Sequence, residues 1–128
     1  MNKYSVSVWN LEKIYANSEA EAVARIKAEF YNGYYRRSDF EYDDVELVEE
    51  ELTDEDLAVW NLCKSDAPYP KQTSCELADY FSEDGDEYLV MAICSVYVEA
   101  EDGEEAMVNA SDCFYYINKD EFEIRISG

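Results

Sequence analysis

The sequence contains an internal repeat, which limits the folds that the chain can adopt. When the sequence is shifted by 84 positions, residues of the same kind fall into register in two stretches. The matched pairs include Tyr4 and Tyr88, Val6 and Val90, Ala22 and Ala106, and Phe30 and Phe114. The offset then falls to 82, where Phe40 meets Phe122. A repeat of this length indicates two copies of one supersecondary unit.

Each copy begins with strand periodicity. Tyr4, Val6 and Val8 alternate with serines, which is typical of a half-buried strand. The segment from Leu11 to Ala16 continues as a second strand, or as the far half of one long bent strand. The sequence leaves both alternatives open.

A capped helix and a further strand follow in each copy. In the first copy Ser18 precedes Glu21 by three residues, which predicts a capping box. In the second copy Asp102 is the predicted cap, with Glu105 at the third helical position. The predicted apolar stripes are Ala22, Val23, Ile26 and Phe30 in the first helix, and Ala106, Met107, Ala110 and Phe114 in the second. The closing strands run from Phe40 to Val48 and from about Phe122 to Ile126.

A different segment connects the copies. Thr53 and the acids after it predict a helix start with Leu57, Trp60 and Leu62 buried, and Pro68 and Pro70 end that helix. We therefore expect an α+β fold of two β-β-α-β (ferredoxin-like) pseudo-repeats joined by a short helical segment. The expected single domain, 1–128, divides into 1–52, 53–86 and 87–128. Whether the two copies share one sheet stays open.

Charge is the unusual part of the composition. The chain of 128 residues has 31 Asp and Glu against 10 Lys and Arg, a net charge of -21. Such a field repels nucleic acid and anionic membranes, and it attracts basic proteins. We expect no direct contact with nucleic acid or membrane.

The acids concentrate in one block that contains no Lys or Arg. Its members are Asp39, Glu41, Asp43, Asp44, Glu46, Glu49, Glu50, Glu51, Asp54, Glu55 and Asp56. The apolar positions Phe40, Tyr42, Val45 and Leu47 require burial, and their change of parity predicts a bulge near Asp43-Asp44. Alternate carboxylates on such a strand lie ~6.6 Å apart. Because duplex DNA has one phosphate per ~3.4 Å of axis on each strand, this row can imitate phosphates.

The block also has an ordinary interpretation, as a solvated strand face and an acidic helix entry. The closing strand of the second copy, residues 121–126, carries only two acids and an arginine. Because of this asymmetry we place a partner-binding surface on the first copy.

A second acidic cluster comprises Glu83, Asp84, Asp86 and Glu87 around Gly85. It lacks the alternating acidic triplet and the distal Glu of an EF-hand, so we expect a polar turn and no calcium site. We include its carboxylates in the predicted partner-binding surface.

The sequence offers little for catalysis. It has no histidine, no Gly-rich phosphate loop and no nucleophile elbow, and its four cysteines form no CxxC pair. With 31 acids, a pair at a glycosidase-like separation has almost no specificity. We expect no enzyme, no metal and no cofactor. With no signal-peptide pattern and no membrane-length apolar run, we expect the cytoplasm.

A family resemblance rests on two matching motifs. The stretch from Tyr4 to Val48 resembles the small DpnD/PcfM-type modules of phages and mobile elements. The motif is Ala16-Asn17-Ser18-Glu19-Ala20-Glu21-Ala22-Val23 in the first copy and Ala100-Glu101-Asp102-Gly103-Glu104-Glu105-Ala106-Met107 in the second. The resemblance covers about two thirds of the chain. It implies no activity that could be assigned to particular residues of this sequence.

In size and acidity the chain also resembles phage-encoded DNA mimics, among them anti-restriction and anti-CRISPR proteins. This resemblance implies an inhibitor that occludes the DNA groove of a host nuclease or CRISPR effector, acting in the host cytoplasm. The alternative is a non-mimic interaction module of a phage or mobile element, which could pair as a homodimer through an exposed strand edge.

Overall fold

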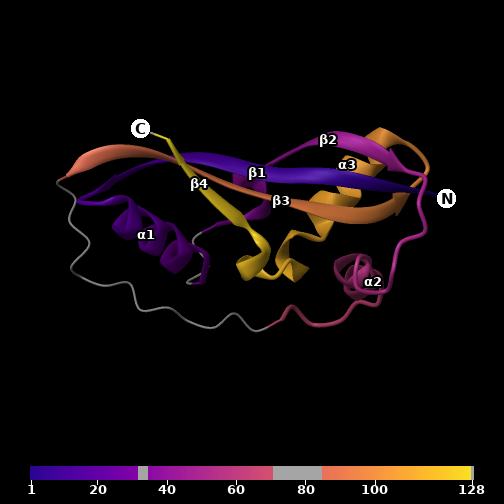
Figure 1. The fold of residues 1–128 in the computed structure, drawn as a ribbon. Helices are drawn as coiled ribbons and strands as arrows, with labels where there is room; N and C mark the ends of the chain where they lie inside the picture. The colour runs from indigo at the N-terminus through magenta and orange to yellow at the C-terminus, as the bar shows by residue number, and fades with distance from the viewer. Residues whose placement is uncertain (32–34, 71–84, 128) are drawn as a thin grey trace.

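A computed structural model describes residues 1–31, 35–70 and 85–127 of the chain (Figure 1). The strands are β1 (Asn2–Ala16), β2 (Glu41–Val48), β3 (Asp86–Ala100) and β4 (Glu123–Ser127). The α-helices are α1 (Glu19–Tyr31), α2 (Ala58–Lys64) and α3 (Gly103–Asp112), and single 3₁₀ turns are η1 (Arg37–Asp39), η2 (Phe114–Tyr116) and η3 (Lys119–Glu121). The predicted α+β class is confirmed.

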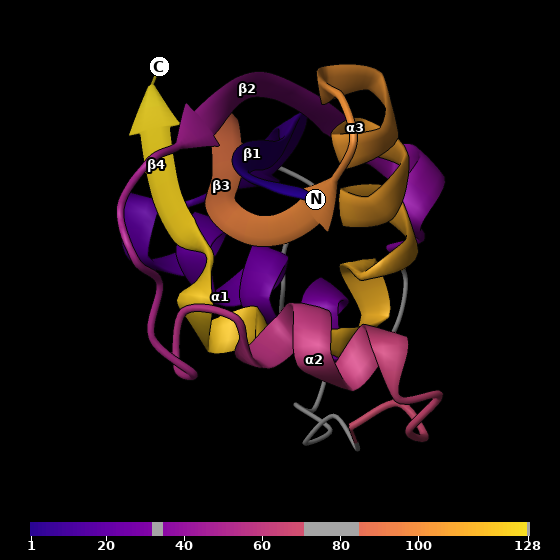
Figure 2. The same ribbon diagram turned by 90° about the vertical axis from the view of Figure 1, so that its right-hand side faces the viewer.

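The described strands form one antiparallel sheet of order β2-β1-β3-β4. β1 and β3 pair along their whole length, from Asn2 opposite Ala100 to Ala16 opposite Asp86. The two copies therefore share one sheet, which answers the question that the sequence left open. In the turned view of Figure 2 the strands bend strongly, as twisted sheets with long central strands do.

The repeat and the sheet register agree. Trp9 and Ile93 are equivalent under the shift of 84, and they are also direct partners across β1 and β3. β2 pairs with the first half of β1, and β4 pairs with the corresponding first half of β3. A pseudo-twofold axis therefore passes between Trp9 and Ile93, with β2 and β4 as equivalent edge strands.

Each half is a β-α-β unit, so the expected β-β-α-β (ferredoxin-like) pseudo-repeat is not confirmed. The structure has the alternative, one long strand of 15 residues before each helix. The middle of β1, at Asn10, Leu11 and Glu12, contains neither Gly nor Pro. Every residue of β1 lies opposite a residue of β3, so the ladder between the two strands continues through this segment and the chain stays extended.

The core lies between the even-numbered face of β1 and β3 and the helices. Its fully buried strand residues are Val6, Val8, Ala16, Val90, Ala92, Val98 and Ala100. Ala22, Ile26 and Phe30 of α1 and Ala106 and Ala110 of α3 are buried as predicted, together with Phe114. Val23 and Met107 are half-buried. Burial of these apolar side chains is the main stabilising term for the fold.

Four phenylalanines join the halves at the centre of the core. Phe30 contacts Phe122 with ring centroids 5.1 Å apart, and Phe40 contacts Phe114 at 4.8 Å. Because Phe30 is equivalent to Phe114 and Phe40 to Phe122, these contacts also follow the pseudo-twofold axis. Aromatic pairs at such distances stabilise beyond the area that they bury.

The predicted helix starts are present. Ser18 Oγ accepts from Glu21 N at 3.1 Å, and Asp102 Oδ1 accepts from Glu105 N at 2.8 Å. Before α2, Thr53 Oγ1 accepts from Asp56 N at 3.2 Å, while Asp56 Oδ2 accepts from Thr53 N at 3.0 Å. These bonds satisfy N–H groups that a first helical turn leaves unpaired.

Two apolar positions were wrongly predicted as buried. Leu62 of α2 is 40% exposed and Leu47 of β2 is 54% exposed. Leu47 lies near the end of an edge strand, where one neighbouring strand covers less of a side chain than two would. Trp60 of α2 is buried, as predicted, and Leu57 before the helix is half-buried.

Candidate partner-binding surface

The predicted acidic surface lies on β2, an edge strand. β2 pairs with β1 on one side, and no described strand pairs with its other side. Glu41, Asp43 and Glu46 lie opposite Trp9, Ser7 and Ser5 of β1. These β1 residues belong to the outer, odd-numbered face, so the three carboxylates share that face.

The predicted bulge is present. The pairing register shifts between Ser5 and Ser7, opposite the middle of β2, and Asp44 has a φ of 46°. Asp is among the residues that tolerate this left-handed conformation. The bulge exposes the Asp44 side chain while Tyr42 and Val45, on either side of it, remain half-buried against the core.

The outer row of carboxylates contacts an indole. Trp9 Nε1 donates to Asp43 Oδ1 at 2.9 Å. Glu41 lies directly across from the same tryptophan. The acidic edge and the aromatic centre of the sheet therefore form one continuous outer surface.

The acidic block continues beyond β2 into the loop before α2. All eleven of its acids are exposed. Two of them are used locally, since Asp39 Oδ2 accepts from Arg36 N at 2.8 Å and Asp56 caps the turn before α2. In the described part of the chain no Lys or Arg forms an ion pair with any member of the block.

The described part of the second predicted cluster, Asp86 and Glu87, does not join this surface. Glu83 and Asp84 lie outside the described residues. Asp86 and Glu87 open β3 opposite Ala16 and Tyr15, at the far end of β1. Six residues separate Trp9, next to Glu41, from Tyr15, next to Glu87, which is ~20 Å along a strand. Lys13 Nζ also lies 3.5 Å from Glu87 Oε1, so this carboxylate is partly compensated.

The outer face of the sheet is a feature that sequence reasoning missed. It carries apolar side chains at odd-numbered positions of the central strands: Trp9, Leu11, Leu89, Met91 and Ile93. Leu11 is 52% and Leu89 38% exposed, and the other three are half-buried. The spacing of two between these apolar residues in both long strands is the sequence signal for a second apolar face.

Carboxylates border this apolar centre on both edges. A single cross-strand row runs from Glu41 through Trp9 and Ile93 to Glu123. Glu123 is bonded to Arg125 at 3.1 Å, whereas Glu41 belongs to the uncompensated block. A partner with apolar side chains and a basic rim would complement the face.

The described residues contain no candidate metal centre, and two of their cysteines are held as neutral thiols. No group of three or more His, Cys, Asp or Glu side chains in the described ranges could hold a metal ion. Burial raises the pKa of the Cys94 thiol to about 12 and raises that of Cys113, which disfavours the reactive thiolates. Burial lowers the pKa of Lys119 to about 8, and its Nζ lies 3.8 Å from the centroid of the Phe114 ring.

Among the helices described, none is long and apolar enough to cross a membrane.

No protein-family model matches the chain, and no curated protein or solved structure matches it either. The resemblances to DpnD/PcfM-type modules and to phage DNA mimics therefore stay predictions.

Proposed function

We propose that this protein is an acidic DNA mimic. It binds the cationic nucleic-acid groove of a host defence complex, with a CRISPR effector as the favoured class, and it inhibits that complex by occlusion. The proposed role is non-catalytic, needs no cofactor and is exerted in the host cytoplasm.

The observation that carries this proposal is the uncompensated acidic block on β2 and the loop after it. Glu41, Asp43 and Glu46 share one face of an edge strand, where alternate residues lie ~6.6 Å apart. Measured along the helix axis, that spacing equals about two phosphate steps of one DNA strand. Effector channels that hold nucleic acid bind its phosphates with basic side chains. An array of carboxylates can bind the same basic side chains in place of the phosphates.

Competition with DNA tests the mechanism. A guide-loaded Cas9-type effector is bound to labelled target DNA, and this protein is added as competitor over a series of salt concentrations. We expect the apparent affinity of the protein to fall with increasing salt, because its contacts are ionic and screened. Binding that does not respond to salt contradicts the electrostatic mechanism.

Matched charge reversals locate the surface. The double variant Glu50→Lys/Glu51→Lys lies in the block, and Glu19→Lys/Glu121→Lys makes the same charge change at exposed positions elsewhere. We expect the first to weaken competition at least about tenfold, since each lost phosphate-like contact contributes about 1 kcal/mol. Equal effects of the two variants would indicate a response to net charge without a defined surface.

The uncovered outer face favours a second candidate, a non-mimic interaction module. Here the contact with a protein partner or a second copy of the chain depends on the apolar side chains of the outer face, which are Trp9, Leu11, Leu89, Met91 and Ile93. The substitution Leu11→Lys changes an exposed side chain at the centre of this face. It should abolish binding by the module and leave a DNA mimic nearly unaffected, whereas Glu50→Lys/Glu51→Lys should do the opposite. Sedimentation analysis of the wild type tests the homodimer.

A further inference from the structure

A polar cavity opens where β1, α1 and the segment before η1 meet. It has a volume of about 390 Å³ and is lined by Asn10, Glu12, Glu29, Tyr35 and Asp39. Asn10 and Glu12 lie on the even-numbered, core-facing row of β1, and Asp39 is exposed at the rim. The acidic block contributes only Asp39, so this cavity is a separate feature from the acidic surface described above.

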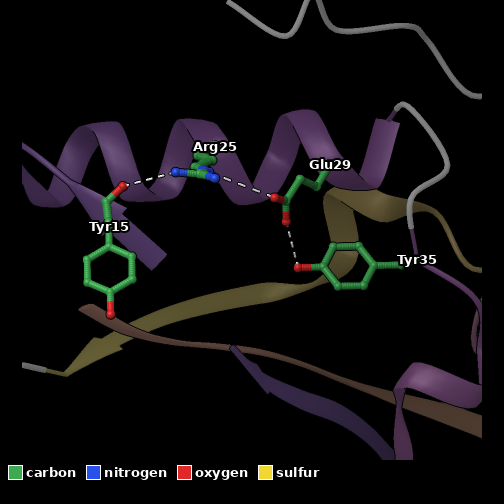
Figure 3. Close-up of polar contacts among 4 residues, drawn as sticks. All are labelled: Tyr15, Arg25, Glu29 and Tyr35. Atoms are coloured by element: carbon green, nitrogen blue, oxygen red, sulfur yellow. Dashed lines mark hydrogen bonds and ion pairs between the residues drawn. The ribbon is translucent and has the colours of Figure 1, made fainter. Parts of the chain in front are cut away.

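Glu29 lines the cavity, and Figure 3 shows its carboxylate between the side chains of Arg25 and Tyr35. Tyr35 Oη donates to Glu29 Oε2 at 3.0 Å. Arg25 Nε lies 3.9 Å from Glu29 Oε1, while Arg25 Nη1 donates to the carbonyl oxygen of Tyr15 at 3.1 Å. Arg25 is thus held between the strand end and α1, and it compensates Glu29 only in part.

Two acceptor atoms in the cavity lack partners among the described residues. Asn10 is only 8% exposed, and its Oδ1 accepts no hydrogen bond. The buried Glu12 Oε2 accepts none either, although the Glu12 carboxyl can share a proton with Glu29. An unsatisfied buried polar atom costs about 1–3 kcal/mol, so such groups usually have a partner or a role.

The second half of the chain shows that the fold does not require polar residues here. Under the shift of 84, Asn10, Glu12 and Glu29 correspond to Cys94, Val96 and Cys113. Val96 is 3% exposed and Cys113 is fully buried, and both belong to the apolar core. The same three positions are therefore filled by small apolar side chains in one half and by acceptors around a cavity in the other.

We propose that this cavity binds a guanidinium group, donated by a small alkylguanidine or by an arginine side chain of a partner. The unpartnered lining atoms are all acceptors, and guanidinium offers five N–H donors in a plane. Asn10 Oδ1 and Glu12 Oε2 each accept one of them, and the carboxylates balance the charge. A metal ion fits less well, because no described group of three acidic side chains could coordinate one.

Protonation of the cavity supports this assignment. Burial first, and then the neighbouring Glu29, raise the pKa of Glu12 to about 7, with Asp39 adding to the effect and Arg25 opposing it. Burial also raises the pKa of Glu29, which Arg25 and the hydrogen bond with Glu12 oppose. In the empty cavity a shared proton reduces the repulsion between Glu12 and Glu29. A bound cation replaces that proton, so binding strengthens as the pH rises.

Titration with agmatine, a small alkylguanidine, tests the proposal by NMR. We expect saturable shifts of the Asn10 side-chain amide, with an affinity at about pH 8 roughly tenfold higher than at about pH 6, because deprotonation of Glu12 precedes binding. 1,4-Diaminobutane, which has the same chain and charge with an ammonium group in place of the guanidinium, should bind more weakly, and Ca²⁺ should cause no comparable shifts. Absence of saturation, a pH-independent affinity, or tighter binding of Ca²⁺ overturns the proposal.

Two variants separate binding from folding. Glu12→Val installs the side chain that the equivalent position 96 carries, and Glu12→Gln keeps the shape of the neutral acid. Both should lower agmatine affinity at least about tenfold, because each removes the carboxylate that faces the cation, while the exposed Glu19→Gln control should bind as the wild type does. If Glu12→Val does not fold, Glu12→Gln and the pH series on the wild type still test the proposal. Unchanged affinity in Glu12→Gln overturns the proposal.

The two sources of the group are distinguished with a blocked Gly-Arg-Gly tripeptide. Binding of the tripeptide as tightly as agmatine assigns the cavity to an arginine of a protein partner. Binding of agmatine alone assigns it to a free small cation. Failure of the acidic-surface variants in the competition assay leaves these results unaffected, because the two sites share only Asp39.

Discussion

At the scale of single residues, Asn10 and Glu12 depart most from the pattern around them. The alternation that predicts β1 places both on the buried face, where Val6, Val8 and Ile14 are their neighbours in the same row. From the sequence, the segment after them is either a second strand or the far half of one long bent strand. The structure shows that the strand continues and that a polar cavity forms beneath it.

The raised pKa of Glu12 makes stability depend on pH. Since the folded-state value of about 7 exceeds the ordinary 4.5, the stabilising contribution is fully present below about pH 4.5 and is lost as the pH rises through about 7. Glu12→Gln stays neutral, so its free energy of unfolding should exceed that of the wild type by about 1–2 kcal/mol at about pH 8, a value reduced for partial exposure. Urea denaturation across this range, with Glu19→Gln as control, measures the difference. Parallel profiles of Glu12→Gln and the wild type would contradict it.

The backbone conformation at Gly85 requires a glycine. Its φ is 144°, and a Cβ there would lie 2.5 Å from the carbonyl oxygen of Ala16. We expect Gly85→Ala to lower the free energy of unfolding by about 1–3 kcal/mol. Gly103→Ala is the matched control, because its nearest atom, Val45 Cγ1, lies at an ordinary 3.6 Å. Urea denaturation of both variants tests this, and equal stabilities would show that the backbone at Gly85 adjusts to a side chain without cost.

At the scale of elements, the bulge in β2 decides how acids and apolar residues are divided between the faces. Asp44→Val should lower the free energy of unfolding by about 1–2 kcal/mol, since a β-branched side chain resists a positive φ. Asp44→Gly removes the same carboxylate but accepts this backbone conformation. The difference between the two variants in urea denaturation isolates the backbone term, and similar stabilities would mean that β2 can pair without the bulge.

The sequence was sufficient for the elements whose signals are local. The capping residues Ser18 and Asp102, the alternation in β1 and the change of parity in β2 each identify a feature that the structure contains. Exposure of Leu47 and Leu62 depends on which elements cover them, and this information is not local. The same is true of the cavity, because Glu12 and Glu29 are brought together only when α1 packs on β1.

At the scale of the whole molecule, charge and topology act together. The fold places the acidic block and the Asp86-Glu87 pair at opposite ends of β1, although both belong to the partner-binding surface predicted from the sequence. Spacing along the chain could not predict this separation, because it follows from the full-length pairing of β1 with β3.

Self-repulsion at this charge should make stability depend on salt. Raising NaCl from a few millimolar to ~0.15 M shortens the screening length to ~8 Å, so we expect the melting temperature to increase by several degrees. In Glu50→Lys/Glu51→Lys two reversals of two units each change the net charge from -21 to -17, and the increase should be smaller. Differential scanning calorimetry checks both. A melting temperature that is independent of salt would show that the carboxylates are too far apart to repel.

The pairing of Trp9 with its own repeat equivalent, Ile93, has an evolutionary consequence. A single β-α-β half would leave the whole edge of its long strand unpaired, and a second identical half could satisfy it through the same register. The chain thus has the geometry of a fused homodimer. In a homodimer every substitution appears in both copies. After fusion a substitution changes only one copy, so the two copies can diverge. One copy could keep Val96 and Cys113 for packing while the other acquired Glu12, Glu29 and an acidic edge. The polar cavity and the acidic surface both lie on that diverged copy, which is the first, N-terminal one.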